Sequence, residues 1–182
     1  MLFKYIILTE FTMFTSIDFA KLNLMDALDL AMLIEAEAYK RYHQFASQLG
    51  GSEPGYFFLR MAENEEKHGK EISEKRKSLF GDIPKNVDIT DIFDIEAPEF
   101  GAIRGTMSVL QAFELGMTAE KKAYDFYNEA LEFITDEEVK ELFTELRDEE
   151  TEHYDALKRM RDNLPPSASI EGELNHDETP YL

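Results

Sequence analysis

The chain repeats part of its own sequence after 85 residues, without a gap in the register. Glu65-Glu66-Lys67-His68 recurs as Glu150-Thr151-Glu152-His153, and residues 34–42 recur, with substitutions, as residues 119–127. The positions that keep their identity carry mostly acidic, imidazole and aromatic side chains: Glu35/Glu120, Glu65/Glu150, His68/His153, Ala38/Ala123, Tyr39/Tyr124 and Tyr42/Tyr127. Such a repeat predicts two copies of one structural unit, related by a pseudo-twofold axis.

Length and composition predict one domain with a packed interior. The 182 residues are 43% hydrophobic and include 14 Phe and 8 Tyr. Because the chain has no Cys, disulfides, zinc ribbons, thiol catalysis and Cys-held iron–sulfur centres are excluded. The formal net charge of −19 argues against binding to nucleic acid or to anionic membranes, and it favours divalent cations near the surface.

The first residues do not predict export. No stretch reaches the roughly 18 apolar residues of a membrane-spanning helix. A signal peptide is disfavoured because the apolar run from Tyr5 to Leu8 is followed by Thr9 and Glu10, and no small-residue cleavage site follows. We therefore expect a cytoplasmic protein. Residues 1–25 are expected to be an extension ahead of a start at Met13, or an arm that packs on a partner subunit.

The spacing of apolar residues predicts four helices, over residues 26–49, 53–79, 106–134 and 136–163. Short turns make each consecutive pair an antiparallel hairpin. Residues 81–105 contain several Pro and Gly, so they predict a long crossover. The expected fold is all-α: a four-helix bundle, residues 26–163, made of two hairpins joined by that crossover. An acidic tail, residues 164–182, would follow.

The repeated motifs predict a metal site inside the bundle. Residues three apart in a helix are rotated by about 60°, so Glu65 and His68 share one face, as Glu150 and His153 do. These faces also carry the apolar stripes, so six candidate ligands point inward: Glu35, Glu65, His68, Glu120, Glu150 and His153. Four carboxylates cannot stay ionised in an apolar interior without counter-charge, whereas two divalent cations would neutralise them. Mixed oxygen and nitrogen ligation suits iron or manganese, and zinc is an alternative.

These motifs resemble the ferritin-like di-iron carboxylate superfamily, and most of all its rubrerythrin and erythrin branch. The resemblance covers about residues 26–163 and implies a ferritin-like bundle that holds two iron ions. It implies that Glu35 with His68 holds one ion and Glu120 with His153 the other. It further implies that Glu65 and Glu150 bridge the two ions, and that the hydroxyls of Tyr42 and Tyr127 bond to ligand carboxylates.

Two features depart from that branch. The chain lacks the Cys residues of the small iron domain that supplies electrons in rubrerythrins. Ala123 lies one turn after Glu120, at the position where rubrerythrins share a second Glu. Ala38 occupies the matching place after Glu35. We therefore expect two near-equivalent ligand sets, with coordination positions open on the alanine side.

The expected function is that of a non-haem di-iron oxidoreductase that reduces O₂ or hydrogen peroxide. Electrons would come from ferrous ion or from an external donor. The alternatives are a manganese catalase-like enzyme, an iron-binding, storage or delivery protein without dedicated catalysis, and a structural bundle with fortuitous Glu and His. We expect a homodimer. Glu37 is expected to be exposed, because its counterpart in the repeat is Lys122.

Overall fold

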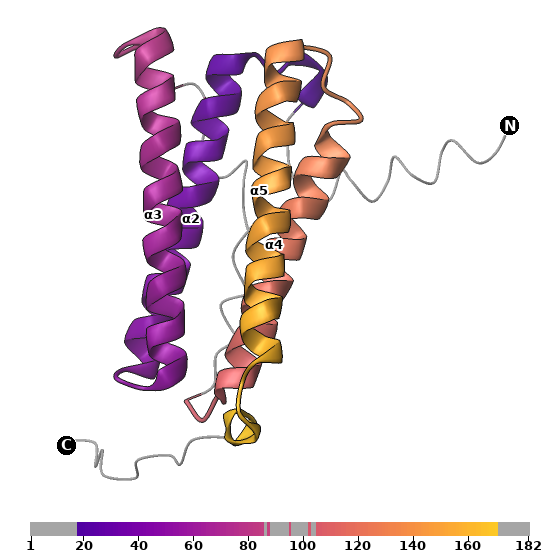
Figure 1. Ribbon diagram of the computed structural model, residues 1–182. Coiled ribbons are helices and arrows are strands. Elements are labelled where there is room, and N and C mark those ends of the chain that lie inside the picture. Colours follow the sequence, from indigo (N-terminus) through magenta and orange to yellow (C-terminus); the bar gives the residue numbers. More distant parts are fainter. Residues whose placement is uncertain (1–17, 86, 88–94, 96–101, 103–104, 171–182) are drawn as a thin grey trace, which may run out of the picture.

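The computed structural model describes residues 18–85, 87, 95, 102 and 105–170. The described residues form four long helices and two short 3₁₀ helices, with no strand among them: η1 (Phe19–Lys21), α2 (Leu24–Leu49), α3 (Glu53–Phe80), α4 (Val109–Ala130), α5 (Glu137–Asp162) and η3 (Pro166–Ser169). Figure 1 shows α2 beside α3 and α4 beside α5, with all four helices running lengthwise. The predicted all-α bundle of two hairpins is confirmed. No described helix is long and apolar enough to cross a membrane.

Side-chain caps and two glycines set the helix ends. Asn23, Ser52, Ser108 and Asp136 each accept a hydrogen bond from a backbone N–H in the first turn of the helix that follows. At the other ends, α2 and α3 stop at glycines whose φ angles are 57° and 66°. Only glycine adopts such angles without strain, so Gly50 sets the turn of the first hairpin and Gly81 ends α3 at the start of the crossover.

The third helix is shorter than the expected 106–134. It starts at Val109 because Ser108 and Gln111 form a capping box. It stops at Ala130, and a turn over residues 131–133 leads to the buried Ile134. Most of the expected crossover, 81–105, lies outside the described residues.

The fold extends beyond the expected limits of 26–163. Phe19 is 3% exposed and packs edge-on against Phe126 and Phe143, with ring centroids 5.7 and 6.3 Å apart. At the other end, Ala168 of η3 is buried. The two 3₁₀ helices therefore pack on the bundle, through Phe19 and Ala168. The remainder of the expected extension and acidic tail, residues 1–17 and 171–182, lies outside the described residues.

The core consists of two apolar clusters. One combines the first half of α2 with the second half of α4 and the first half of α5, and includes Phe19, Ile34, Tyr127 and Phe143. The other combines the second half of α2 with the first halves of α3 and α4, and includes Tyr42, Phe45, Phe57, Phe58 and Phe113. Both clusters contain residues of both hairpins, so burial of apolar surface holds the hairpins together.

A buried ion pair joins α2 to α3 at one end of the first hairpin. Arg76 donates from Nε and Nη2 to the two carboxylate oxygens of Asp29, at 2.8 and 3.1 Å, and from Nη1 to the carbonyl of Gly81 at 3.0 Å. The hydrogen bonds that Arg76 donates to Asp29 are the main cause that raises the pKa of Arg76. This fork fixes the end of α3 against the start of α2.

Gly116 of α4 lets the two hairpins approach closely. A Cβ atom at this position would lie 3.0 Å from Cζ of Phe57 and 3.4 Å from Cδ1 of Leu157. We expect Gly116→Val to lower the free energy of unfolding by about 1–3 kcal/mol, because the added atoms overpack this contact. Gly116→Ala should cost less, since its better helix propensity offsets part of the clash. Urea unfolding measures both; a valine variant as stable as the parent would show that Phe57 does not pack on α4 in this way.

Candidate metal centre

The six candidate ligands form a polar layer between the two apolar clusters. On each helix they fall where one cluster ends and the other begins: Glu35 on α2, Glu65 and His68 on α3, Glu120 on α4, Glu150 and His153 on α5. The four Glu residues are between 0% and 3% exposed. A layer of carboxylates in the middle of a core costs free energy unless something compensates the charge.

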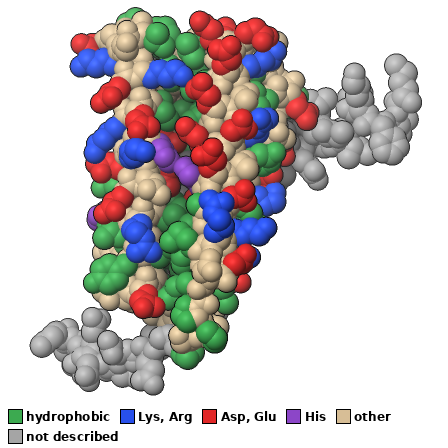
Figure 2. Space-filling view, viewed as in Figure 1, with side chains coloured by type: hydrophobic (Ala, Val, Ile, Leu, Met, Phe, Trp, Pro, Cys, Tyr) green, Lys and Arg blue, Asp and Glu red, His purple; other side chains and the backbone are tan. Residues whose placement is uncertain are grey.

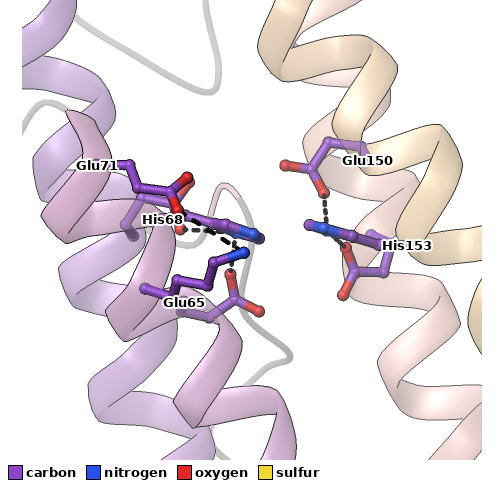
Figure 3. Close-up of polar contacts among 8 residues, drawn as sticks. Glu65, His68, Glu71, Glu150 and His153 are labelled. Atoms are coloured by element: carbon purple, nitrogen blue, oxygen red, sulfur yellow. Dashed lines mark ion pairs between the residues drawn. The ribbon is translucent and has the colours of Figure 1, made fainter. Parts of the chain in front are cut away.

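The first hairpin brings together Glu35, Glu65 and His68. One possible ligand atom from each of these residues lies within 4.8 Å of the others. The Nδ1 atom of His68 is 3.6 Å from Oε2 of Glu65 and 3.9 Å from Oε2 of Glu35. Figure 3 shows His68 extending from α3 toward the opposite hairpin, with Glu65 below it.

The second hairpin repeats this arrangement with Glu120, Glu150 and His153. These residues also offer ligand atoms within 4.8 Å of one another. The Nδ1 atom of His153 is 3.4 Å from Oε2 of Glu120 and 3.8 Å from Oε2 of Glu150. The two triads are therefore built alike, as the gap-free repeat predicts.

The two triads face each other across the seam between the hairpins. The rings of His68 and His153 stack with centroids 4.8 Å apart and an angle of 5° between their planes (Figure 3). Each triad is complete within its own hairpin, and the stacked rings join them into one site. The donor set, four carboxylates and two imidazoles, fits two divalent ions with mixed oxygen and nitrogen ligation.

The two histidines differ in their affinity for protons. Burial is the main cause that lowers the pKa of His68, and the positive charges of His153 and Lys67 lower it further. Burial also opposes protonation of His153, but the hydrogen bond and the negative charge of Glu120 outweigh it and raise the pKa of His153. A metal ion must therefore displace a proton more often from the second triad than from the first.

On acidification of the metal-free protein, His153 should take up its proton at a higher pH than His68. The raised pKa means that protonated His153 stabilises the fold below the ordinary pKa of histidine, and that this stabilisation is lost as the pH rises through the raised value. The lowered pKa of His68 has the opposite sign, so its protonation destabilises the fold. NMR of ¹⁵N-labelled histidine measures both midpoints, and Glu120→Gln should lower that of His153. The reverse order of titration would contradict this account.

The remaining sequence candidates lie beside the polar layer. Tyr42 and Tyr127 are fully buried, one in each apolar cluster. The ring of Tyr42 stacks on that of Phe58 with centroids 5.9 Å apart, and the ring of Tyr127 packs edge-on against that of Phe143 with centroids 5.4 Å apart. Ala38 and Ala123 are also fully buried, on the helices that carry Glu35 and Glu120. The tyrosines thus flank the site from both ends of the bundle.

A small acidic hollow opens onto the first triad. Its volume is about 130 Å³, and His68, Glu71, Glu145 and Glu149 are among its lining residues. Figure 2 shows histidine side chains at the surface of the seam, with acidic side chains beside them. Among these acids, partial desolvation raises the pKa of Glu149. The sequence did not distinguish the three glutamates from solvated helix faces, because their position depends on how α3 and α5 pack.

One structural expectation is wrong. Glu37 is half-buried and pairs with the guanidinium of Arg41, which is itself 1% exposed. The substitution of Glu37 by Lys122 in the repeat suggested a solvated position. A buried arginine one turn later in α2 instead draws the carboxylate inward.

Comparison of this chain with known proteins finds one matching protein family and several similar solved structures. The protein-family model described as Rubrerythrin matches residues 26–161. No curated protein sequence matches the chain significantly. An uncharacterised conserved protein from Magnetospirillum magnetotacticum MS-1 is 27% identical, with a TM-score of 0.59, over 79% of this chain and 97% of that chain.

Two further solved structures share the fold at lower identity. A bacterioferritin from Rhodobacter capsulatus, described with a metal-free dinuclear site and haem iron, is 18% identical over 83% of this chain and 94% of that one, with a TM-score of 0.52. A manganese catalase from Anabaena PCC7120 is 16% identical over 88% of this chain and 84% of that one, with a TM-score of 0.50. At these identities the likeness shows the ferritin-like fold alone.

Proposed function

Because the family match spans most of the chain, this protein belongs to the rubrerythrin family, and we propose that it is a di-iron oxidoreductase that reduces O₂ or hydrogen peroxide. The observation that carries the proposal is the pair of buried Glu/Glu/His triads, joined by the stacked rings of His68 and His153. When bound, two ferrous ions supply two electrons, which is enough to reduce hydrogen peroxide to water.

The residues of the chain hold and neutralise the metal pair. Glu35 with His68 would hold one ion and Glu120 with His153 the other, and Glu65 and Glu150 would be shared between the two ions. The four buried carboxylates balance the four positive charges of two divalent ions, so the loaded site is neutral in the apolar core. The apolar clusters on both sides shield the four carboxylates from water, which strengthens their electrostatic interactions.

The tyrosines and the alanines shape the space around the layer. We propose that the hydroxyls of Tyr42 and Tyr127 hydrogen-bond to ligand carboxylates and fix their orientation. Ala38 and Ala123 lack the length to reach a metal, so they leave room for O₂ or peroxide on their side. An external donor or further ferrous ion would return the electrons, because this sequence has no Cys that could hold a second iron centre.

Anaerobic titration with ferrous ion, followed by O₂ or hydrogen peroxide, tests the proposal. We expect two iron ions per chain, with consumption of the oxidant in proportion to the loaded iron. A Glu65→Gln/Glu150→Gln variant is the matched control, since it removes the bridging carboxylates without a change in size. Iron bound at well under two ions per chain would contradict the dinuclear site. Iron that binds but consumes neither oxidant would favour a storage or delivery role.

Manganese is the second candidate metal, since the same donor set accepts it. Anomalous diffraction across the iron and manganese absorption edges of protein purified without added metal identifies the element. Manganese at both positions, with disproportionation of hydrogen peroxide, would replace the di-iron proposal by a catalase-like one. Native mass spectrometry of the same sample tests the proposed homodimer.

A further inference from the structure

A second and larger hollow lies in the seam between the hairpins, away from the polar layer. Its volume is about 880 Å³, and its walls come from the first turns of α3 and α4, the last turns of α5, and η3 with the residues before it. Phe57 and Phe113 belong to the inner wall, with ring centroids 4.3 Å apart. Figure 2 shows hydrophobic side chains along the lower part of the seam. A cavity of this size falls within the range of about 300–1,000 Å³ typical of small-molecule sites.

Two arginines line this cavity, and neither has a carboxylate partner among the described residues. Arg60 of α3 and Arg159 of α5 are both exposed lining residues. In the described part of the chain, neither side chain forms an ion pair, although acidic residues outnumber basic ones by 38 to 19. Glu53 is the one acidic residue among the described lining residues. The cavity therefore combines an apolar wall with free positive charge on a strongly negative protein.

The internal repeat provides a comparison for this charge within the same molecule. At the other end of the seam, the counterpart of Arg60 is Glu145, which is held by Lys75 at 3.1 Å. The counterpart of Lys75 in the larger cavity is Met160. The ion pair between α3 and α5 at one end is thus replaced, at the other end, by an arginine beside an apolar side chain.

The second arginine follows the same pattern. The counterpart of Arg159 is Glu74, so both arginines stand where the repeat has glutamates. The counterpart of Phe57 is Leu142, which stays apolar and buried. The apolar wall is therefore common to both ends of the seam. The two positions at the rim are arginines at this end and glutamates at the other end. Packing of the bundle does not require that reversal, because the other end packs with the opposite sign.

We propose that this cavity binds a single-chain fatty acid. Its carboxylate would lie between Arg60 and Arg159, where charge-assisted hydrogen bonds to guanidinium groups are strong. Its alkyl chain would lie along Phe57, Phe113 and Met160, out of water. The proposal goes beyond the metal chemistry and does not depend on it, since no candidate metal ligand lines the cavity.

Isothermal titration of the full-length protein with decanoate, below its micelle concentration, tests the proposal. Decyltrimethylammonium, with the same chain and the opposite charge, is the comparison ligand. Bulk electrostatics on a protein of charge −19 favours the cation, so tighter binding of decanoate points to the arginines. We expect one decanoate per chain, bound about tenfold or more tightly than the cation, with and without metal. Absence of decanoate binding, or tighter binding of the cation, would overturn the proposal.

A double variant locates the site. Arg60→Gln/Arg159→Gln should weaken decanoate binding by about tenfold or more, because it removes both guanidinium groups. Lys158→Gln/Arg161→Gln makes the same change in net charge on α5, outside the cavity lining, and should leave the affinity unchanged. Circular dichroism checks that both variants fold. Equal affinities in the two variants would overturn the assignment.

Two other occupants would also overturn the proposal, and both can be detected. If the arginine variant changes the native mass of the protein, the cavity is an interface between copies of the chain. If a photoreactive residue at position 160 cross-links the full-length protein to its own residues 171–182, that segment occupies the cavity instead. We expect the native mass to be unchanged and the photoreactive residue to cross-link to added decanoate.

Discussion

Glu150→Ala is expected to remove both metal ions, whereas Glu35→Ala should remove mainly one. The proposed bridging role of Glu150 means that its loss takes a ligand from each ion and leaves uncompensated charge between them. Glu35 is a terminal ligand of one ion in the same proposal. In Glu150→Ala, we expect the affinity for both ions to fall on the order of 100-fold or more. Substitution of residues that only orient metal ligands already lowers metal affinity by about 10–100-fold. Metal analysis after dialysis against a weak chelator measures the number of ions per chain.

The control for this experiment is Glu152→Ala. Glu152 lies on α5 next to His153, but it is exposed and belongs to neither triad. Its replacement should leave two ions bound. Equal losses of metal from Glu150→Ala and Glu35→Ala would show that Glu150 does not bridge. The two triads would then be separate mononuclear sites, each within its own hairpin.

Removal of metal should lower the melting temperature by tens of degrees. A ligand that binds only the folded state stabilises it by about 4 kcal/mol when its free concentration is about a thousand times Kd. Two such ions, in a chain of this length, correspond to a change in Tm on the order of 15–30 °C. Differential scanning calorimetry with and without a chelator measures the change. A Tm that stays constant or rises on chelation would support the structural bundle with fortuitous Glu and His.

The substitutions Glu65→Gln/Glu150→Gln should raise the Tm of the metal-free protein and lower the Tm of the metal-loaded protein. Both carboxylates are buried, at 1% and 3% exposure. In the metal-free protein, their replacement by neutral amides relieves repulsion and desolvation, so the variant should melt above the metal-free parent. With metal present it should melt below the loaded parent, because it cannot bind the pair. A purely structural effect of the two substitutions would have the same sign in both states.

The grouping of the six candidate ligands was predictable because each half of the repeat contains one set of three. A single Glu-x-x-His on an acidic helix is ordinary, but the same spacing at a fixed offset of 85 selects six residues out of many acids. Helical periodicity then places them on inward faces, and the structure groups them as two triads. Neither the sequence nor the structure decides whether Glu65 and Glu150 bridge the ions, since this depends on the positions of the ions.

Other features depended on tertiary packing and were not predictable. Ile134 continues the apolar spacing of α4 beyond its actual end at Ala130, because a buried residue after a turn resembles one more helical turn. Arg41 is 1% exposed, although the charge of an arginine predicts an exposed position. Its counterpart in the repeat is the apolar Phe126. Phe19 packs into the core from outside the expected domain. In each case the partner that decides the outcome lies on another element.

Each hairpin contains one complete set of metal donors, and this has a consequence for how such a centre arises. A single α2–α3 unit that paired with an identical copy would place two Glu/Glu/His triads face to face across a true twofold axis. Joining two such units in one chain keeps the centre and frees the two halves to diverge. The differences between the halves, such as the opposite charges at the two ends of the seam, are properties that a symmetric pair of identical units could not have.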